Sequence, residues 1–465
     1  MLDVSREEIV SGSLVRALVV LAGPLVAQNF ALVAQEVVDL FWVGRLGATA
    51  VAAVGLAAVF VALLSVPVGM VFTGTQVVTS QRVGADETEA ARAVPVSAAA
   101  VAVALALVLA VVVFFGAEGA VALFVDDPGV ATFAVDYLLA YTLALVTTGI
   151  SDTLEGGFVG WGDSRAALYI NLTAIAVNVV ADPLLILGVD PFPRLEVFGA
   201  ALATGIGYGC GAALALGLAL RGRREFVLTR EVLRPRFEAA REVVTVGAPV
   251  AGQRAGRQVA RLVMVGVVSA VGGAAGLAAY HIGSRVATVA FVPAQGIAGA
   301  ATSVVGQNLG AENPSRARRA TWVSAAIAAV GLSVFGLVQW LLPVPIARVF
   351  VPDLSGTALA HTVLYLQILA YGYWALGAIY TVESGFNGAG KTKVSMVSTL
   401  VQYWLVRLPV AVVGAYVLEL GVAAVFWAVT LSNVAAACWL AGYFRYSTDR
   451  GMLERAAREA AGGEE

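Results

Sequence analysis

Residues 178–183 read NVVADP and place an amide, Asn178, and a carboxylate, Asp182, four positions apart in an otherwise apolar run. On a helix this spacing puts both side chains on one face, one turn apart. The run covers residues 166–188, about 23 positions, which is long enough to cross a bilayer. A carboxylate costs roughly 2.5–3.5 kcal/mol at the centre of a spanning helix, so we expect Asp182 to serve a function.

The composition is that of a polytopic membrane protein. Hydrophobic residues make up 59% of the 465 residues and charged residues 13%, against about 45–50% and 25% in soluble domains. Mean hydropathy is +0.85. The polar, acidic start of the chain does not match a cleavable signal peptide, and a net charge of −2 gives no sign of a nucleic-acid partner.

Motifs for enzyme chemistry are missing from the sequence. No HExxH, GxSxG or GxxxxGK[ST] pattern occurs, so we expect neither an enzyme nor a cofactor. Cys210 and Cys438 have no metal-type spacing. We expect both cysteines to be buried packing residues.

About twelve apolar stretches follow one another, separated by charges and turn residues. Each is long enough to span a bilayer as a helix. The sequence therefore predicts an all-α membrane protein with twelve transmembrane helices. The stretches are 14–43, 50–79, 94–115, 131–152, 166–188, 197–220, 240–268, 276–307, 320–342, 358–384, 394–417 and 421–444.

The two halves of the chain repeat each other. Four matches occur at an offset that drifts only from 225 to 228, and such regularity indicates an internal duplication. Six spans per half place both halves the same way up. We therefore expect two six-helix lobes related by a pseudo-twofold axis along the membrane normal. The matches are LAGPLVAQ at 21–28 with VGAPVAGQ at 246–253, Pro67 with Pro293, SQRVGAD at 80–86 with GQNLGAE at 306–312, and GFVGWGDS at 157–164 with GFNGAGKT at 385–392.

Charges in the loops predict the domain boundaries and the orientation. Residues 221–241 hold seven arginines, and we interpret them as a cytoplasmic linker between a first lobe at 1–220 and a second lobe with its tail at 242–465. Lysine and arginine gather on this linker and on the other even-numbered loops. The bias predicts a multi-pass protein of the cell membrane with both termini cytoplasmic.

Matched prolines lie inside matched spans. Pro24 falls in the first span and Pro249 in the seventh. Proline removes a backbone hydrogen bond and kinks a helix. We expect the first span to bend at Pro24 in a protein that opens to both sides of the membrane.

Polar residues line the first span. Gln28, Gln35 and Asp39 follow helical spacing along one stripe, and Glu36 lies on the neighbouring stripe. Lipid would not solvate such a stripe, so it should face a cavity. The alternative is that Asp39 lies near the outer membrane face, hydrated and without a function.

Asp39 and the 178–183 stretch together suggest an ion site. With Thr204 from the following span they offer almost only oxygen ligands, which suit Na⁺ and equally a proton shared by two acids. Two neighbouring carboxylates in a partly dry cavity do not both stay ionised without a cation. We predict an H⁺ or Na⁺ site and no other metal site, with an interhelical structural bond as the alternative role of Asn178. The predicted ligands are Asp39, Asn178, Asp182 and Thr204, supported by Gln28, Gln35 and Glu36.

The second half does not reproduce these acids. Met264 stands where Asp39 would map, and the seventh span instead carries three arginines on one face. Two interpretations of these arginines exist. In the first, they line a cavity that selects anionic or zwitterionic substrates. In the second, they pair with acids across the lobe interface or extend toward the outer surface. Both interpretations stay open. The residues are Arg254, Arg257 and Arg261, with Glu383 as the main buried acid of this half.

These features resemble the multidrug and toxic compound extrusion (MATE) transporters over roughly residues 10–446, and most of all the archaeal and DinF-like branch. The resemblance implies secondary active antiport of small organic substrates against H⁺ or Na⁺. It carries the first-lobe ion site over to Asp39, Asn178, Asp182 and Thr204, and the bending proline to Pro24. Two departures stand out: Gln35 replaces a tyrosine of some members, and Leu376 stands near the place of an acid of the NorM-like branch.

Other functions remain open at this point. A flippase for a lipid or a lipid-linked oligosaccharide shares the architecture, and the second-half arginines would suit its pyrophosphate head group. An intramembrane enzyme would need a nucleophile, metal cluster or cofactor loop that the sequence lacks. Each lobe packs internally, so a monomer suffices. Neither the substrate nor the choice between H⁺ and Na⁺ follows from the sequence.

Overall fold

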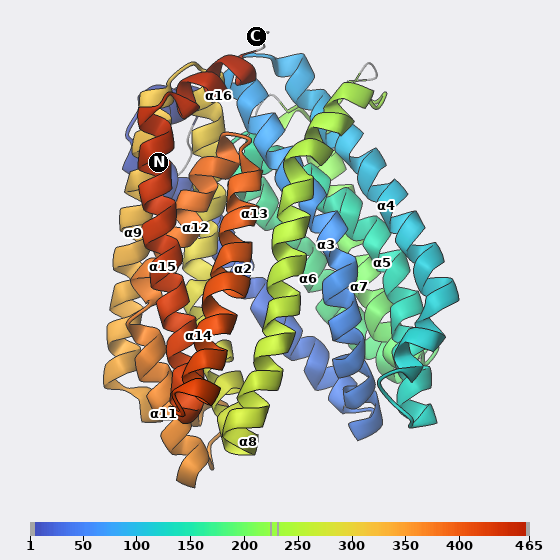
Figure 1. The fold of residues 1–465 in the computed structure, drawn as a ribbon. Helices are drawn as coiled ribbons and strands as arrows, with labels where there is room; N and C mark the ends of the chain where they lie inside the picture. The colour runs from blue at the N-terminus through green and yellow to red at the C-terminus, as the bar shows by residue number, and fades with distance from the viewer. Residues whose placement is uncertain (1–4, 224–225, 230–231, 462–465) are drawn as a thin grey trace. The chain divides into compact units, whose positions relative to one another are not determined.

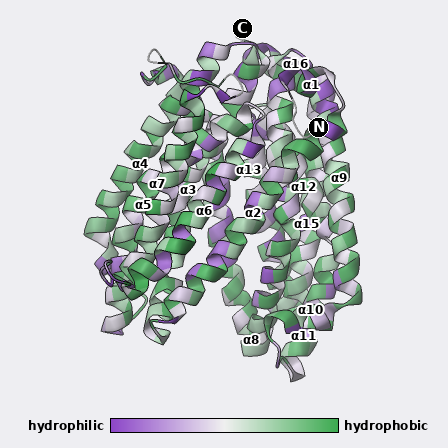
Figure 2. Ribbon diagram, turned by 180° about the vertical axis from the view of Figure 1, so that it is seen from behind, coloured by the Kyte–Doolittle hydropathy of each residue, from purple (hydrophilic) through white to green (hydrophobic). Residues whose placement is uncertain are grey.

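The computed structural model describes residues 5–223, 226–229 and 232–461, and every regular element within these ranges is a helix (Figure 1). Ten of the described helices are long and apolar enough to cross a membrane, and a bent helix pair counts as an eleventh span. Figure 2 shows hydrophobic residues along most of each long helix and hydrophilic residues on short helices such as α16. The prediction of an all-α membrane protein is confirmed.

The first half contains all six expected spans, preceded by a short helix. The predicted stretches are the apolar centres of longer helices that continue into the loops. The helices are α1 (Arg6–Ser11), α2 (Leu14–Gly44), α3 (Ala48–Gly84), α4 (Thr88–Ala122), α5 (Pro128–Gly160), α6 (Ser164–Leu187) and α7 (Glu196–Leu220).

The second half is less regular. Its first helix, α8 (Phe237–Gly310), is 74 residues long and contains both the seventh and the eighth expected span, with a break at Gly273, where φ is 54°. The tenth expected span is the pair α11 and α12, bent by 50°. The other helices are α9 (Pro314–Leu341), α10 (Pro343–Phe350), α11 (Gly356–Ala370), α12 (Tyr373–Gly388), α13 (Thr392–Leu400), η2 (Val401–Arg407), α14 (Leu408–Val412), η3 (Val413–Val417), α15 (Gly421–Asp449) and α16 (Met452–Ala460), where η marks π-helix.

The helices pack into two units. The N-unit contains Ala27–Ala251, and the C-unit contains Glu7–Val26 and the chain from Gly252 on. The boundaries fall two residues after Pro24 and two residues after Pro249, which are matched positions of the repeat. Each unit therefore includes the start of the first helix of the other half, so the packing boundaries differ from the lobe boundaries expected at 220 and 242.

Glycines bring helices of the N-unit into backbone contact. A Cβ atom at Gly160 of α5 would lie 2.8 Å from the Gln76 carbonyl oxygen of α3. A Cβ atom at Gly207 of α7 would overlap the Ala174 carbonyl oxygen of α6 and approach Asn178 Cβ to 3.1 Å. Small residues permit this close packing, which provides much of the attraction between helices in lipid.

The described part of the linker is attached to the N-unit. Arg223 Nε donates to Asp163 Oδ2 at 2.5 Å, and Asp163, which is buried, also accepts from the Ala166 N–H at the start of α6. The Phe226 ring packs against Phe158, with centroids 4.8 Å apart. A charge pair and an aromatic contact thus hold this segment against α5 and α6.

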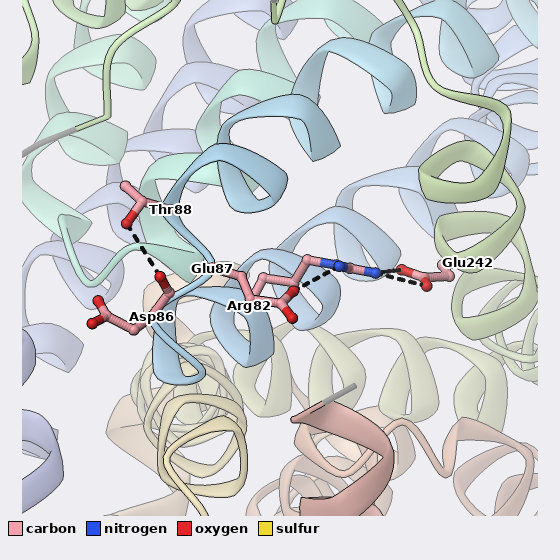
Figure 3. Close-up of polar contacts among 5 residues, drawn as sticks. All are labelled: Arg82, Asp86, Glu87, Thr88 and Glu242. Carbon is pink, nitrogen blue, oxygen red and sulfur yellow. Dashed lines mark hydrogen bonds and ion pairs between the residues drawn. The ribbon is translucent and has the colours of Figure 1, made fainter. Parts of the chain in front are cut away.

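An arginine near the end of α3 forms hydrogen bonds with the start of α8. Arg82 donates to Glu87 Oε2 at 2.7 Å and to Glu242 Oε1 at 2.8 Å (Figure 3). The matching position in the C-unit is Asn308, whose amide donates to the Ile9 carbonyl oxygen of α1 at 3.3 Å. In each unit, this position of the repeat therefore contacts the helix start that comes from the other half of the chain, or the segment just before that start.

The expectation that both cysteines are buried is wrong. Cys210 and Cys438 are exposed free thiols. Cys210 directly precedes Gly211, which faces α6, and one residue turns a helix by about 100°. That rotation carries Cys210 off the packed face.

We predict that Gly207→Ala destabilises the protein, because the added methyl group would push α7 away from α6 at the level of Asn178. Overpacking of this kind costs about 1–3 kcal/mol. The thermal unfolding temperature of the detergent-solubilised protein is the measurement. Gly217→Ala on the same helix is the control, since a Cβ atom there has no neighbour within 4 Å. Equal melting temperatures for the two variants would contradict the prediction.

Candidate functional site

Three helices of the N-unit bring the two acids of the sequence analysis together. Asp39 lies on α2, Asp182 on α6 and Thr204 on α7. The carboxyl groups of Asp39 and Asp182 lie close enough to interact electrostatically. Two carboxylates in a poorly solvated place repel each other unless a proton or a cation is bound, so the pair suits such an ion.

Asn178 links the acids to their neighbours. In one orientation its amide oxygen accepts from Gln35 Nε2 at 2.8 Å, and its nitrogen lies 3.4 Å from Asp182 Oδ1 and 3.5 Å from Thr204 Oγ1. In the rotated orientation the nitrogen donates to Asp39 Oδ1 at 2.9 Å, and the oxygen accepts from the Thr204 N–H at 3.2 Å. We assign the rotated orientation, because the amide nitrogen then meets a carboxylate oxygen at a shorter distance.

The cluster is closed on one side and accessible on the other. Asp182 is fully buried, with 0% of its surface exposed, while Asp39 and Thr204 are half-buried. Asp182 Oδ2 has no hydrogen-bond partner. A bound proton or a small cation satisfies such an oxygen, and an unpaired buried polar atom is otherwise costly. The arrangement suits reversible binding of a positive ion.

Two supporting residues of the sequence analysis lie elsewhere. Glu36 is exposed and acts on Asp39 only through its charge. Gln28 is buried in a different cluster, described below. Gln35 does lie against the site, with its Nε2 atom 2.8 Å from the Asn178 side-chain amide.

Tyr137 is a site residue that the sequence analysis missed. This half-buried tyrosine of α5 interacts electrostatically with both Asp39 and Asp182, and its ring stacks on Tyr141 at 6.3 Å between centroids. A polar hydroxyl in an apolar span was its only signal in the sequence.

A second polar cluster lies in the N-unit around Glu155. Gln28 Nε2 donates to Glu155 Oε1 at 2.7 Å, and Asn171 Nδ2 donates to Glu155 Oε2 at 2.6 Å. All three side chains are buried. The cluster joins α2, α5 and α6 by hydrogen bonds.

The C-unit contains the matching cluster around Glu383. Gln253 Nε2 donates to Glu383 Oε1 at 3.1 Å and to Thr399 Oγ1 at 2.8 Å, and the Thr399 hydroxyl donates to Glu383 Oε1 at 3.3 Å. These three residues match Gln28, Glu155 and Asn171 at offsets of 225 to 228. The duplication therefore extends to the buried hydrogen bonds of the two units.

The arginines of the seventh span lie in the C-unit. Arg257 interacts with Tyr380, Tyr403 and Glu383. Arg254 is half-buried and Arg261 is exposed on the same helix. No group of three or more His, Cys, Asp or Glu side chains that could hold a metal occurs among the residues that the structure describes.

Pro24 lies inside α2, which continues as one helix through this position. Its place two residues before the unit boundary puts the missing backbone hydrogen bond where α2 passes from one unit to the other.

Comparisons with known proteins agree with this architecture. A protein-family model described as MatE matches residues 24–184 and again residues 249–413. The multidrug resistance protein NorM of Burkholderia vietnamiensis is 28% identical over 434 residues, 92% of this chain and 93% of that protein. A solved MOP superfamily transporter from Pyrococcus furiosus has a TM-score of 0.89 at 20% identity, covering 97% of this chain and 99% of that one. An outward-facing multidrug resistance MATE family transporter also has a TM-score of 0.89 at 20% identity, with coverage of 96% and 99%.

We predict that Glu155→Leu destabilises the protein, because it leaves the buried Gln28 amide without its acceptor. A buried polar group without a partner costs about 1–3 kcal/mol. Gln28→Leu should therefore cost less in the Glu155→Leu background than in the wild type. The measurement is a double-mutant cycle on thermal unfolding in detergent, and strictly additive effects would count against the cluster.

Proposed function

Because the chain belongs to the MatE family of membrane transporters, we propose that it is a secondary active antiporter that exports small organic substrates in exchange for H⁺ or Na⁺. As a member of this family it acts in the lipid bilayer on small molecules and is not an enzyme. The named relatives are multidrug resistance proteins, which supports drug-like substrates. We further propose a monomer in the cell membrane with both termini cytoplasmic.

The observation that carries this proposal is the close approach of Asp39 to Asp182, which is fully buried. When both acids lose their protons, two negative charges face each other in a poorly solvated place, and a cation must enter or the groups must separate. When the ion is bound, its positive charge lets the two acids stay close together. The charge state of the pair thus favours different arrangements of α2 and α6.

Pro24 supplies the mechanical link in this proposal. Asp39 lies in the part of α2 that belongs to the N-unit, and the residues before Ala27 belong to the C-unit. Separation of Asp39 from Asp182 would move the N-unit part of α2, and the helix bends most easily where proline leaves a carbonyl without a partner. A substrate and an ion then compete through their different affinities for the two states.

Asp39, Asn178, Asp182 and Thr204 accommodate either coupling ion. Carboxylate, amide and hydroxyl oxygens coordinate Na⁺, and two neighbouring carboxyl groups can share a proton. The discriminating experiment is substrate efflux from proteoliposomes under a pH gradient alone and under a Na⁺ gradient alone. Efflux that responds to neither gradient would contradict antiport.

A lipid or lipid-linked oligosaccharide flippase of the same superfamily is the alternative function. NorM and the outward-facing MATE family transporter named above are multidrug resistance proteins, so these two comparisons do not favour it. Movement of a labelled lipid head group by the reconstituted protein, without efflux of a soluble drug, would support the flippase.

We predict that Asp39→Asn and Asp182→Asn each fold and insert but lose gradient-driven efflux down to the background of protein-free liposomes. The amide keeps the size of the carboxyl group but binds neither a proton nor Na⁺ as a charged partner. Glu36→Gln is the matched control, because Glu36 lies one turn from Asp39 and is exposed, and it should keep most of the efflux. Full efflux by both Asp variants would end the proposed coupling mechanism.

A further inference from the structure

Three arginines of the C-unit converge on one tyrosine. Arg257 and Arg261 lie one turn apart on α8, and Arg407 lies on η2. The Arg407 guanidinium carbon is 3.9 Å from the centroid of the Tyr403 ring. Tyr403 also interacts electrostatically with Arg257 and Arg261. We call these four residues the arginine–tyrosine cluster.

The cluster lies at membrane depth. Arg257 is about 20 residues from the start of α8 and about 16 residues before the break at Gly273, which is roughly 24 Å of helix from that break. Arg407 lies near the middle of the span Thr392–Val417. Charged side chains so far from both ends of a spanning segment are rare, and they usually mark a pathway for a substrate or an ion.

The positive charges of the cluster exceed the negative charges around it. Arg407 is buried and bonds only to neutral oxygens, Ser432 Oγ at 2.9 Å and Asn433 Oδ1 at 2.7 Å. Among the described residues, no carboxylate lies within ion-pair distance of Arg257, Arg261 or Arg407. Glu383 is the one acid that interacts with Arg257. Arg257 thus has one carboxylate near it and the buried Arg407 has none, and a buried charge requires a counter-charge from elsewhere.

The fold does not need these arginines. The N-unit positions that match Arg257 and Arg261 are Leu32 and Glu36. The N-unit nevertheless contains the same buried glutamine–glutamate pair as the C-unit. The excess positive charge is therefore specific to the C-unit and is not part of the duplicated scaffold.

The backbone and the aromatic rings around the cluster also point to a ligand. Tyr403 and Arg407 lie in a π-helical segment, Val401–Arg407, and π-helix segments inside α-helices are frequent at functional sites. Tyr380, which interacts with Arg257, stacks on Phe291 at 5.9 Å between centroids. Planar guanidinium groups bind carboxylates and phosphates with two hydrogen bonds and stack on aromatic rings.

We propose that Arg257, Arg261, Arg407 and Tyr403 form a binding site for the carboxylate or phosphate group of a planar organic anion, which the protein takes as a transport substrate. The proposal depends on the proposed antiport function only in stating that the bound anion is transported. The guanidinium groups neutralise the anion, and the tyrosine rings accept the planar part of the ligand.

Binding tests the proposal without any ion gradient. The full-length protein is placed in phosphatidylcholine nanodiscs, and the binding of four naphthalene probes is measured by isothermal titration calorimetry. The probes share one ring system and differ in charge: 1-naphthoate and 1-naphthyl phosphate are anions, 1-naphthalenemethanol is neutral, and 1-naphthalenemethylamine is a cation. We expect at least one anion to bind roughly tenfold or more tightly than the neutral and cationic probes.

Variants assign this binding to the cluster. Arg261→Gln changes an exposed side chain and should fold, and it should weaken anion binding by roughly tenfold or more. Arg407→Lys keeps the charge but loses the planar, two-bond geometry, and it should also weaken binding. Arg285→Gln is the control, because Arg285 is an exposed arginine of α8 outside the cluster, and it should bind the anion as the wild type does.

Three results would overturn the proposal: equal binding of all four probes, no anion binding up to millimolar concentration, or undiminished binding in Arg261→Gln. Loss of binding in phosphatidylglycerol nanodiscs would assign the site to a lipid head group and overturn the transported-substrate form. The Asp39→Asn variant separates the two proposals. If this variant binds the anion but efflux by the wild type responds to neither gradient, the antiport proposal fails and the anion site stands. If the wild type shows gradient-driven efflux of a cationic dye but does not bind the anion, only the anion site fails.

Discussion

A carboxyl group that is cut off from water must find its partners inside the protein, and this constraint governs the N-unit. Asp182 is fully buried, so its charge requires a proton, a cation or hydrogen-bond donors at close range. Asp39 comes within reach of Asp182 only if α2 approaches α6 closely, where Asn178 also links Asp39 to Thr204 of α7. The close contact of Gly207 with α6 serves the same geometry. Packing of the helices and the chemistry of the acids therefore depend on each other.

Duplication provides one scaffold, and divergence gives its two copies opposite charge. Both units keep a buried glutamine–glutamate pair between helices, Gln28 with Glu155 and Gln253 with Glu383. Around this common element the N-unit carries acids, whereas the C-unit has Met264 at the place of Asp39 and arginines in the same helix. The two copies thus divide the work in our proposals: one binds the coupling cation, and the other binds the anionic group of the substrate.

Much of this was predictable from the sequence. Apolar length, matched prolines and the repeat predicted twelve spans, and the spacing of Asn178 and Asp182 predicted their common face. Features that depend on contacts between distant segments were not predictable. Tyr137 joins the acids from α5, and Asn171 reaches Glu155 from α6, without a local signal in either span. The two spans expected within α8 meet at Gly273, whose non-helical backbone alone makes the turn that we expected from a loop. The cysteines were misplaced because apolar composition does not tell which side of a helix is packed.

The exchange of helix starts between the units has a consequence for biosynthesis. The first turns of α8 pack against α3 so closely that Gly74 and Val243 meet at their backbones, and both belong to the N-unit. A ribosome that has released only the first six spans has therefore not yet made the residues that complete this unit. Conversely, the α2 residues before Ala27 cannot pack in their unit until the chain from Gly252 on, more than 200 positions later, has been translated. Each unit therefore depends for its completion on residues from both halves of the chain.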